Sequence, residues 1–412
     1  MKKSFLMIIL FFTVVIGLFG CGKKRNANEI VIWWPSGTEM QKLINDAIDE
    51  YKQINPNVTI RVVKKAGLDV YSAYKIAIND NNSRPDIAIL DHVYVQALAY
   101  ENLLANLSKY GSDTDVKSKY PENIYAANVY NGSNYGLPLS ANTVVLMYNK
   151  NILAECGVTT IPTTYDELID ACKKVESKGY TPFAQPINNS FVAMEFASYV
   201  ARVGGSLISA DYKTVKINST LVRDAIDKWN NLSKYASQAE YEEGKFYNGK
   251  IAFIEMGSWN LSKVSGTGAL FECGYAEMVK LSDQYDNYSG LGLYSFVVSE
   301  KSKIKKDAYD FIKFLSTDKK FQLGFAKAKD LLPVTNEALN DSYYTNDPAL
   351  SIYAKQLQKV ASRPGTPIWP TMEKQIVNLM FRVVKSSTNE EIENAIADAQ
   401  SECQKATDRK YN

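Results

Sequence analysis

The sequence predicts an α/β protein built from two lobes. Its 412 residues exceed what one core normally holds, and the usual domain size gives about two to three domains, of which two is the economical interpretation. Strand-like apolar runs alternate with helical patterns, which is typical of mixed, mostly parallel sheets with helices on both faces. One run, 250–259, stands out. We interpret it as a buried strand that stops at Gly257 and places Trp259 at its carboxyl end, either as a binding platform or as a core plug.

Residues 1–20 have the pattern of a secretory signal peptide. Two lysines precede an apolar run that extends to Phe19, and Leu-Phe-Gly-Cys then ends at Cys21. This short motif resembles a bacterial lipobox, in which the cysteine is lipidated. We therefore expect residues 21–28 to be a lipid anchor and tether that hold the protein at the extracellular face of the cell membrane.

The composition excludes several classes of function. Lys+Arg 47 against Asp+Glu 45 gives a net charge of +2, and no basic stripe with interleaved aromatics suggests a nucleic-acid partner.

Four cysteines remain after Cys21. None shows metal-site spacing, so we expect free thiols, with a Cys156–Cys172 disulfide as the alternative. His92 is the only histidine, and we expect no metal site, no cofactor and no catalytic residues. The loop at 244–250 has the glycine and lysine spacing of a phosphate-binding loop, but isoleucine follows it where Ser/Thr is needed to bind the metal. We therefore do not expect a nucleotide site there.

The first third of the chain reads as a β-α-β unit followed by a third strand. The expected strands are 29–34, 58–62 and 86–91, and the helix between the first two carries apolar residues from Leu43 to Tyr51. Ser36-x-x-Glu39 fits a capping box for that helix. Asp91 and His92 follow the third strand, where they are either ligand-binding groups or a helix cap and a satisfied polar residue.

The remaining elements follow an extended run at 135–148, which suits a chain leaving one lobe for the other. We expect a further strand near 290–298. Helices are expected near 165–175, 191–202, 221–235, 308–315, 372–385 and 390–405, with Thr164 capping the first and Thr388-x-x-Glu391 the last.

Three tryptophans lie at strand ends or in loops: Trp34, Trp259 and Trp369. Rings in such places can stack on the apolar face of a sugar while nearby polar side chains bind its hydroxyls. Trp33 and Trp34 alternate across their strand, so only one is expected to reach a crevice. Trp229 lies at helical spacing with apolar residues and is predicted to be core.

Several motifs together resemble the extracellular solute-binding proteins, family 1, of bacterial ABC importers, which include maltose-type and multiple-sugar-type members. They are Ile30-Val-Ile-Trp-Trp34, Pro85-Asp-Ile-Ala88, Tyr135-Gly-Leu-Pro138, Leu146-Met-Tyr-Asn-Lys150, Pro162 to Leu168, Asn248-Gly-Lys250 through Gly257-Ser-Trp259, and Ala308 to Leu315 with Leu332-Pro333. The resemblance implies a two-lobe periplasmic-binding-protein-like fold (type II) with a hinge between the lobes. The expected organisation is 29–140 plus 291–338 for lobe 1 and 141–290 plus 339–412 for lobe 2.

The resemblance also implies a ligand site between the lobes, with Trp259 as the family's sugar-stacking tryptophan. The expected ligand-binding residues are Trp34, Ser36, Asp91, His92, Tyr94, Asn142, Asn189, Phe191, Trp259 and Trp369. Maltose-type members carry a tryptophan at the end of the third strand, where this chain has Leu90, so a maltodextrin ligand is in doubt.

The function implied is that of a monomeric lipoprotein that binds a carbohydrate, an oligosaccharide above all, and delivers it to ABC importer permease subunits. One alternative is the same fold binding a polyol or a glycerophosphodiester. The other is a cell-surface carbohydrate-active enzyme, since acidic residues are plentiful although no spacing nominates a catalytic pair.

Overall fold

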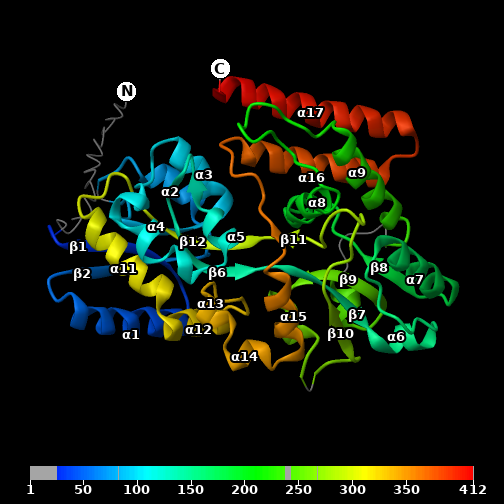
Figure 1. Cartoon of the computed structure of the whole chain (residues 1–412), viewed down its shortest axis with the longest axis horizontal. Helices are drawn as coiled ribbons and strands as arrows, with labels where there is room; N and C mark the ends of the chain where they lie inside the picture. The colour runs from blue at the N-terminus through cyan, green and yellow to red at the C-terminus, as the bar shows by residue number, and fades with distance from the viewer. Residues whose placement is uncertain (1–25, 82, 237–242, 267, 412) are drawn as a thin grey trace, which may run out of the picture.

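A five-stranded sheet organises one half of the molecule (Figure 1). The computed structural model describes residues 26–411 except 82, 237–242 and 267. The strand order is β2-β1-β3-β12-β6. The bounds are β1 (Glu29–Pro35), β2 (Thr59–Lys65), β3 (Ile87–Asp91), β6 (Leu137–Asn142) and β12 (Gly292–Val298). Since β12 lies between β3 and β6, a strand from late in the chain completes a sheet begun at the N-terminus.

A four-stranded sheet organises the other half, with the order β10-β7-β9-β8. Its strands are β7 (Val144–Asn149), β8 (Thr181–Ala184), β9 (Ile251–Gly257) and β10 (Cys273–Ala276). The run singled out in the sequence is therefore a central strand, and every residue of β9 is buried. Two small sheets pair β4 (Val129–Tyr130) with β5 (Ser133–Asn134) and β11 (Ser289–Gly290) with β13 (Val360–Ala361).

Both main sheets are mixed. Parallel pairing joins β1 to β2 and β3, and β8 to β9, whereas β12 is antiparallel to both neighbours and β7 is antiparallel to β9 and β10. The predicted α/β class is confirmed. The expectation of mostly parallel sheets is wrong, because strands that return from the other half enter each sheet in the opposite direction.

Helices cover both faces of the first sheet. One face packs on α1 (Thr38–Ile54), α11 (Lys305–Thr317) and α12 (Lys319–Ala328), and the other on α2 (Tyr71–Ala77) and α3 (His92–Tyr100). Alternation along each strand sends successive side chains to opposite faces, so Ile87 and Ile89 join one core while Ala88 and Leu90 join the other.

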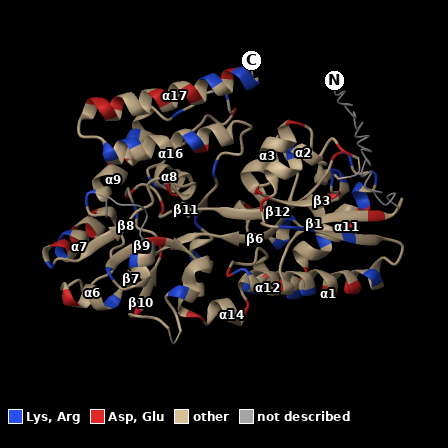
Figure 2. Ribbon diagram, turned by 180° about the vertical axis from the view of Figure 1, so that it is seen from behind, with Lys and Arg blue, Asp and Glu red and all other residues tan. Residues whose placement is uncertain are grey.

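The second sheet carries its own helical layer. Its core packs on α7 (Tyr165–Ser177), α8 (Phe191–Arg202), α9 (Thr220–Ser233) and α16 (Trp369–Lys385), with α17 (Asn389–Tyr411) outermost. Trp229 is buried in this core, as predicted. Figure 2 shows both signs of charge spread over the outer helices of the two halves.

Shorter helical elements are η1 (Leu107–Tyr110), α4 (Ser112–Asp115), η2 (Lys117–Lys119), α5 (Glu122–Ala126), α6 (Lys150–Glu155), α10 (Glu243–Tyr247), η3 (Ser258–Lys263), α13 (Asn336–Leu339), α14 (Ser342–Thr345) and α15 (Pro348–Gln356).

The chain passes between the two sheets more than once. Residues 142–144 connect β6 to β7, residues 290–292 connect β11 to β12, and the segment from α13 to β13 leads from α12 back toward the second sheet. We propose these passages as the hinge, with the lobe boundaries as predicted from the sequence.

Two of the three predicted helix caps form. Thr164 and Glu167 make a complete capping box at α7, and Thr388 with Glu391 makes the same exchange at α17. The box predicted from Ser36 and Glu39 is wrong, because α1 begins after Gly37 and no side chain caps it.

The described cysteines, Cys156, Cys172, Cys273 and Cys403, are all free, so the disulfide alternative does not hold. Within the described ranges, no helix is long and apolar enough to cross a membrane.

Candidate functional site

Trp259 lies where β9 gives way to η3, and it is partly exposed. Its ring meets the Phe191 ring edge to face, with centroids 5.8 Å apart and an interplanar angle of 88°. The residues beneath the two rings are Val144, Met194 and Met278, which are buried. A Cβ at Gly257 would lie 1.8 Å from the indole. Glycine is therefore required for the ring to fold back over the end of its own strand.

A polar cluster lies at the end of β3, on the edge of the first sheet. Asp91 caps α3 by accepting a hydrogen bond from Val93 N (3.4 Å). Nη2 of Arg363, in the loop that leads to α16, donates to both Asp91 carboxylate oxygens, at 2.8 and 2.7 Å. Both side chains are mostly buried, with 19% of Asp91 and 8% of Arg363 exposed. This ion pair joins the first sheet to the helical layer of the second.

Electrostatics fix the charge states of this pair. Burial alone would raise the pKa of Asp91, but Arg363 and His92 outweigh it and hold that pKa well below its usual range. His92 Nδ1 lies 2.9 Å from Asp91 Oδ1. Burial lowers the pKa of His92, partly opposed by Asp91, so the ring is neutral near pH 7. Asp91 is ionised, and its charge is largely compensated by Arg363.

Two further carboxylates flank this ion pair. Asp69, in the loop between β2 and α2, is in contact with solvent, yet the protein around it and the charge of Asp91 raise its pKa to about 6. Glu373 on α16 is partly buried, and burial raises its pKa, with Arg363 opposing. No Lys or Arg side chain pairs with either carboxylate among the described residues. Both stay available to accept hydrogen bonds.

Tyrosine rings line the same region. Tyr71 and Tyr94 stack with centroids 4.0 Å apart and planes 12° apart. Burial raises the pKa of the Tyr94 hydroxyl, and the charges of Glu373 and Asp69 add to this, which places both carboxylates close to that ring. Tyr294 pairs with Asp91 across β12 and β3. Flat rings and carboxylates therefore lie side by side.

The structure brings together only part of the predicted site. Asp91 and Tyr94 lie in the polar cluster, and Phe191 packs on Trp259. Asn142 lies at the first passage, where its Oδ1 abuts Gly292. Two other predicted residues, Ser36 and Asn189, are exposed, and Asn189 Oδ1 accepts a hydrogen bond from Phe191 N (3.0 Å) at the start of α8.

The structure corrects the predicted site at Trp34, Trp369 and His92. All three side chains are buried, so they are not available to a ligand. Trp34 Nε1 donates to Met40 O (2.8 Å), and the ring packs among Phe296, Phe321 and Phe325. Trp33, on the opposite face, is also buried, so neither ring of that pair reaches a crevice. Trp369 lies in the core of the second half. His92 is buried, and its Nδ1 faces the carboxylate of Asp91. The three tryptophans do not converge.

Sequence reasoning missed Asp69, Arg363 and Glu373. Asp69 follows the second parallel strand, so the rule that selected Asp91 would have selected it as well. Arg363 lies in the proline-rich loop that drew attention to Trp369, and its charge was the stronger signal. Glu373 is a single acidic residue on an amphipathic helix, and no local pattern marks it.

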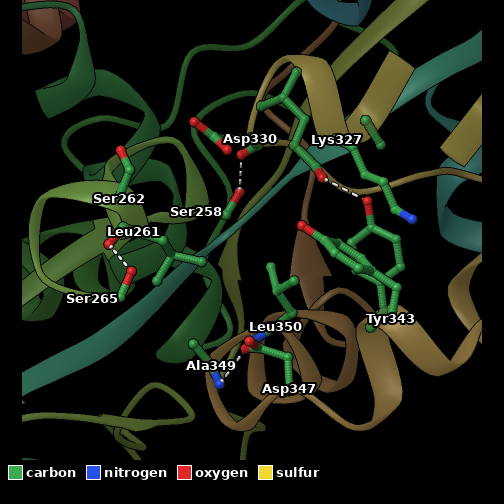
Figure 3. A pocket seen from close by; sticks show the side chains of 13 residues that line it. Ser258, Leu261, Ser262, Ser265, Lys327, Asp330, Tyr343, Asp347, Ala349 and Leu350 are labelled. Atoms are coloured by element: carbon green, nitrogen blue, oxygen red, sulfur yellow. Dashed lines mark hydrogen bonds between the residues drawn. The ribbon is translucent and has the colours of Figure 1, made fainter. Parts of the chain in front are cut away.

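A separate pocket of about 210 Å³ lies between η3, the end of α12 and the α14–α15 segment (Figure 3). Ser258 Oγ donates to Asp330 O (2.8 Å) across it, and Asp347 accepts hydrogen bonds from Ala349 N and Leu350 N, both at 2.8 Å. Its volume is below the ~300–1,000 Å³ of typical ligand sites. Since the chain itself occupies these polar groups, we favour the Asp91 cluster and the Trp259–Phe191 pair as the candidate ligand contacts.

Comparison with known proteins gives consistent matches. The profile described as bacterial extracellular solute-binding protein matches residues 46–352. The chain is 26% identical over 400 residues to the maltotriose-binding protein of Pyrococcus abyssi, covering 91% of this chain and 82% of the relative. It is 24% identical over 393 residues to the galactooligosaccharide-binding protein of Bacillus subtilis, covering 89% of each.

The fold matches solved structures as well. The cyclic α-maltosyl-1,6-maltose binding protein of Arthrobacter globiformis superposes with a TM-score of 0.80 at 22% identity, over 92% of this chain and 99% of that one. At this level of identity, the likeness shows that the two chains share a fold and no more.

Proposed function

This chain belongs to the bacterial extracellular solute-binding proteins, and from that premise we propose that it captures an oligosaccharide between its two lobes for delivery to an ABC importer. Relatives named for maltotriose and galactooligosaccharides support a carbohydrate ligand. The observation that carries the proposal is the Asp91–Arg363 ion pair, which links the two halves and is flanked by unpaired carboxylates and by tyrosine rings.

The proposed contacts suit a neutral, hydroxyl-rich ligand. Asp69, Asp91 and Glu373 offer carboxylate oxygens that accept hydrogen bonds from sugar hydroxyls. Trp259 and Tyr94 offer flat faces for the apolar side of a pyranose ring. Charge-assisted hydrogen bonds of this kind are stronger than neutral ones, and the rings add apolar contact at low entropic cost. Ser36, Asn142 and Asn189 remain predicted ligand positions.

Ligand capture and lobe closure are coupled in this proposal. A ligand that touches residues of both halves stabilises only the arrangement in which both walls face it, so its binding shifts the population toward the closed form. Arg363 and Glu373 follow the last passage of the chain, whereas Asp69 and Asp91 belong to the first half of the molecule. Closure therefore depends on contacts that span the hinge.

The charges in the cluster argue against a glycerophosphodiester. Arg363, the guanidinium in this cluster, is already paired with Asp91, and Asp69 and Glu373 would repel a phosphate. A carbohydrate-active enzyme is the other alternative. We expect no turnover of maltooligosaccharides or galactooligosaccharides, and product formation that is lost in Glu373→Gln would favour that enzyme instead.

The lipid anchor is also part of the proposal. Cys21 lies outside the described residues, as does the signal sequence, and the proposal rests on the lipobox pattern. Few residues separate Cys21 from β1, so acylation would hold the first lobe close to the membrane surface. We also propose that the protein acts as a monomer and that its partners are the permease subunits of an ABC importer.

We expect Trp259→Ala to lose sugar binding while the unliganded protein stays folded. Removing the indole deletes the stacking surface but leaves the buried strand β9 unchanged. The measurement is a thermal-shift screen of maltotriose and galactooligosaccharides, since ligand at about 100 times Kd adds roughly 2.7 kcal/mol of stability.

Tyr343→Ala is the matched control, because Tyr343 is an aromatic residue 46% exposed at the other pocket. It should keep the full ligand-induced shift. An equal shift in Trp259→Ala and the wild type would remove Trp259 from the site.

A further inference from the structure

Two acidic side chains and one arginine are buried together on α8 and β9, the elements that lead to Phe191 and Trp259. Glu195 and Arg202 both lie on α8 and are fully buried, and Glu255 on β9 is 3% exposed. Arg202 Nη1 lies 3.4 Å from Glu255 Oε1 and also donates to Val279 O (3.3 Å), while Nη2 donates to Ser198 Oγ (3.2 Å). One cation therefore faces two carboxyl groups.

Glu195 has no donor for either of its carboxyl oxygens among the described residues. The group that faces it is the Glu255 carboxyl, which is satisfied by Arg202. An isolated buried charge is strongly unfavourable, so a buried acid without a cation takes up a proton. Burial, and then the charge of Glu255, raise the pKa of Glu195 well above its usual range. In its neutral form Glu195 is a donor, and Glu255 is the acceptor that faces it.

The acid pair connects the two elements that present the rings of the proposed site. Glu195 lies four residues, about one helical turn, after Phe191 at the start of α8. Glu255 lies four residues before Trp259 on β9. Met194, adjacent to Glu195, packs beneath both rings. A change in the separation of α8 and β9 at the acid pair would therefore move Phe191 relative to Trp259.

Building on the proposed function, we propose that protonated Glu195, hydrogen-bonded to Glu255, is a positioning residue that holds Phe191 against Trp259 in the ligand site. Loss of this proton places a second negative charge beside Glu255 with only Arg202 to compensate. The two carboxylates then repel each other, α8 moves away from β9, and the ring pair loosens.

The other charged and titratable groups around the pair leave this balance unchanged. Tyr199 on α8 is fully buried beneath the Arg202 guanidinium, 4.3 Å from its carbon to the ring centroid. Burial and Glu255 raise the pKa of Tyr199, so it remains neutral through the range of interest. Because the folded pKa of Glu195 is raised, its contribution to stability is present at low pH and is lost as pH rises through that value.

The test compares Glu195→Gln and Glu195→Leu with the wild type. Gln keeps the shape and the donor but cannot ionise, whereas Leu removes the donor. The readout is the near-ultraviolet circular dichroism of Trp259 in unliganded protein, obtained by subtracting the spectrum of the corresponding Trp259→Phe variant. Spectra are recorded between about pH 6 and 9.5, a range that reaches the documented pKa of buried glutamates.

We expect the Trp259 signal of the wild type to weaken as pH rises, the Gln variant to keep it throughout, and the Leu variant to lack it even at about pH 6. Maltotriose affinity should follow the same order. Glu176→Gln, on the exposed face of α7, is the charge-matched control and should behave as the wild type.

Identical spectra for the wild type and the Gln and Leu variants would overturn the proposal. The spectra need no ligand. A protein that shows the expected spectral order but binds no sugar therefore contradicts the proposed function alone, and a protein that binds sugar with no spectral difference contradicts the role of Glu195 alone.

Discussion

A missing Cβ decides where Trp259 lies. The other four tryptophans, Trp33, Trp34, Trp229 and Trp369, are large rings in well-packed interiors, where burial of the whole side chain is favourable. Gly257, two residues before Trp259, leaves room for the indole to lie across the strand end, so the ring is partly exposed and packs against Phe191. The glycine two residues before the ring therefore distinguishes the partly exposed Trp259 from the buried tryptophans.

Asp69 gives the residue-scale prediction. Its pKa is raised to about 6 by the surrounding protein and by Asp91, so its contribution to stability is present below the unfolded value and is lost as pH rises toward 6. Asp69→Asn removes the unfavourable charge and keeps the acceptor that Tyr71 N uses (3.2 Å). We expect the variant to melt above the wild type at about pH 7.5 and at the same temperature at about pH 4.

Asp283→Asn, in an exposed turn, is the control for a general effect of charge and should leave the melting temperature unchanged at both pH values. If Asp69→Asn lowers the melting temperature at the higher pH, Asp69 is a stabilising partner and not an unpaired carboxylate.

Helix caps show which local signals specify an element. Thr164 is followed by Glu167 and precedes an uninterrupted apolar stripe, and its capping box forms. Ser36 and Glu39 have the same spacing, but Gly37 is the N-cap of α1 and Pro35 ends β1, so the chain turns sharply between strand and helix. The side chain of Ser36 makes no capping hydrogen bond there. Spacing alone did not distinguish the two cases.

Replacing these two residues tests the difference. Thr164→Ala should destabilise the protein by about 1 kcal/mol, because a formed N-cap is lost. Ser36→Ala, the matched control, should change stability by less than about 0.5 kcal/mol, because no cap is present. Urea denaturation of the unliganded variants measures both. Equal losses would mean that Ser36 caps α1 in solution.

At the level of elements, the sequence predicted what is local and missed what is tertiary. The β-α-β start, the buried strand ending at Gly257 and the helix bearing Trp229 all follow from periodicity. Asp69, Arg363 and Glu373 come together around Asp91 only because the loop after β2 and the distant segment 363–373 converge there, and no spacing encodes that. Trp34 was misplaced because alternation shows that two faces exist without showing that helices cover both.

The two halves of the molecule are joined by more than the passages of the chain. The core that covers one face of the first sheet continues into the second, where it includes Val145, Met147 and Ile254. The C-terminal helix also reaches the first half, since Tyr100 Oη donates to Lys410 O (2.8 Å) and Lys410 Nζ lies 3.0 Å from Glu101. The described part of the chain therefore has one apolar cluster that belongs to both halves.

We expect the unliganded protein to unfold in a single cooperative transition, because melting either sheet exposes apolar surface of this shared cluster. Differential scanning calorimetry measures it, with the van't Hoff and calorimetric enthalpies in agreement. Adding about 1 M salt weakens the partly exposed ion pair of Lys410 and Glu101 but leaves the apolar cluster intact, so the transition should stay single. Two resolved transitions would mean that the lobes fold independently. Merging of those two transitions on addition of a bridging sugar would then assign the coupling to the ligand and not to the shared core.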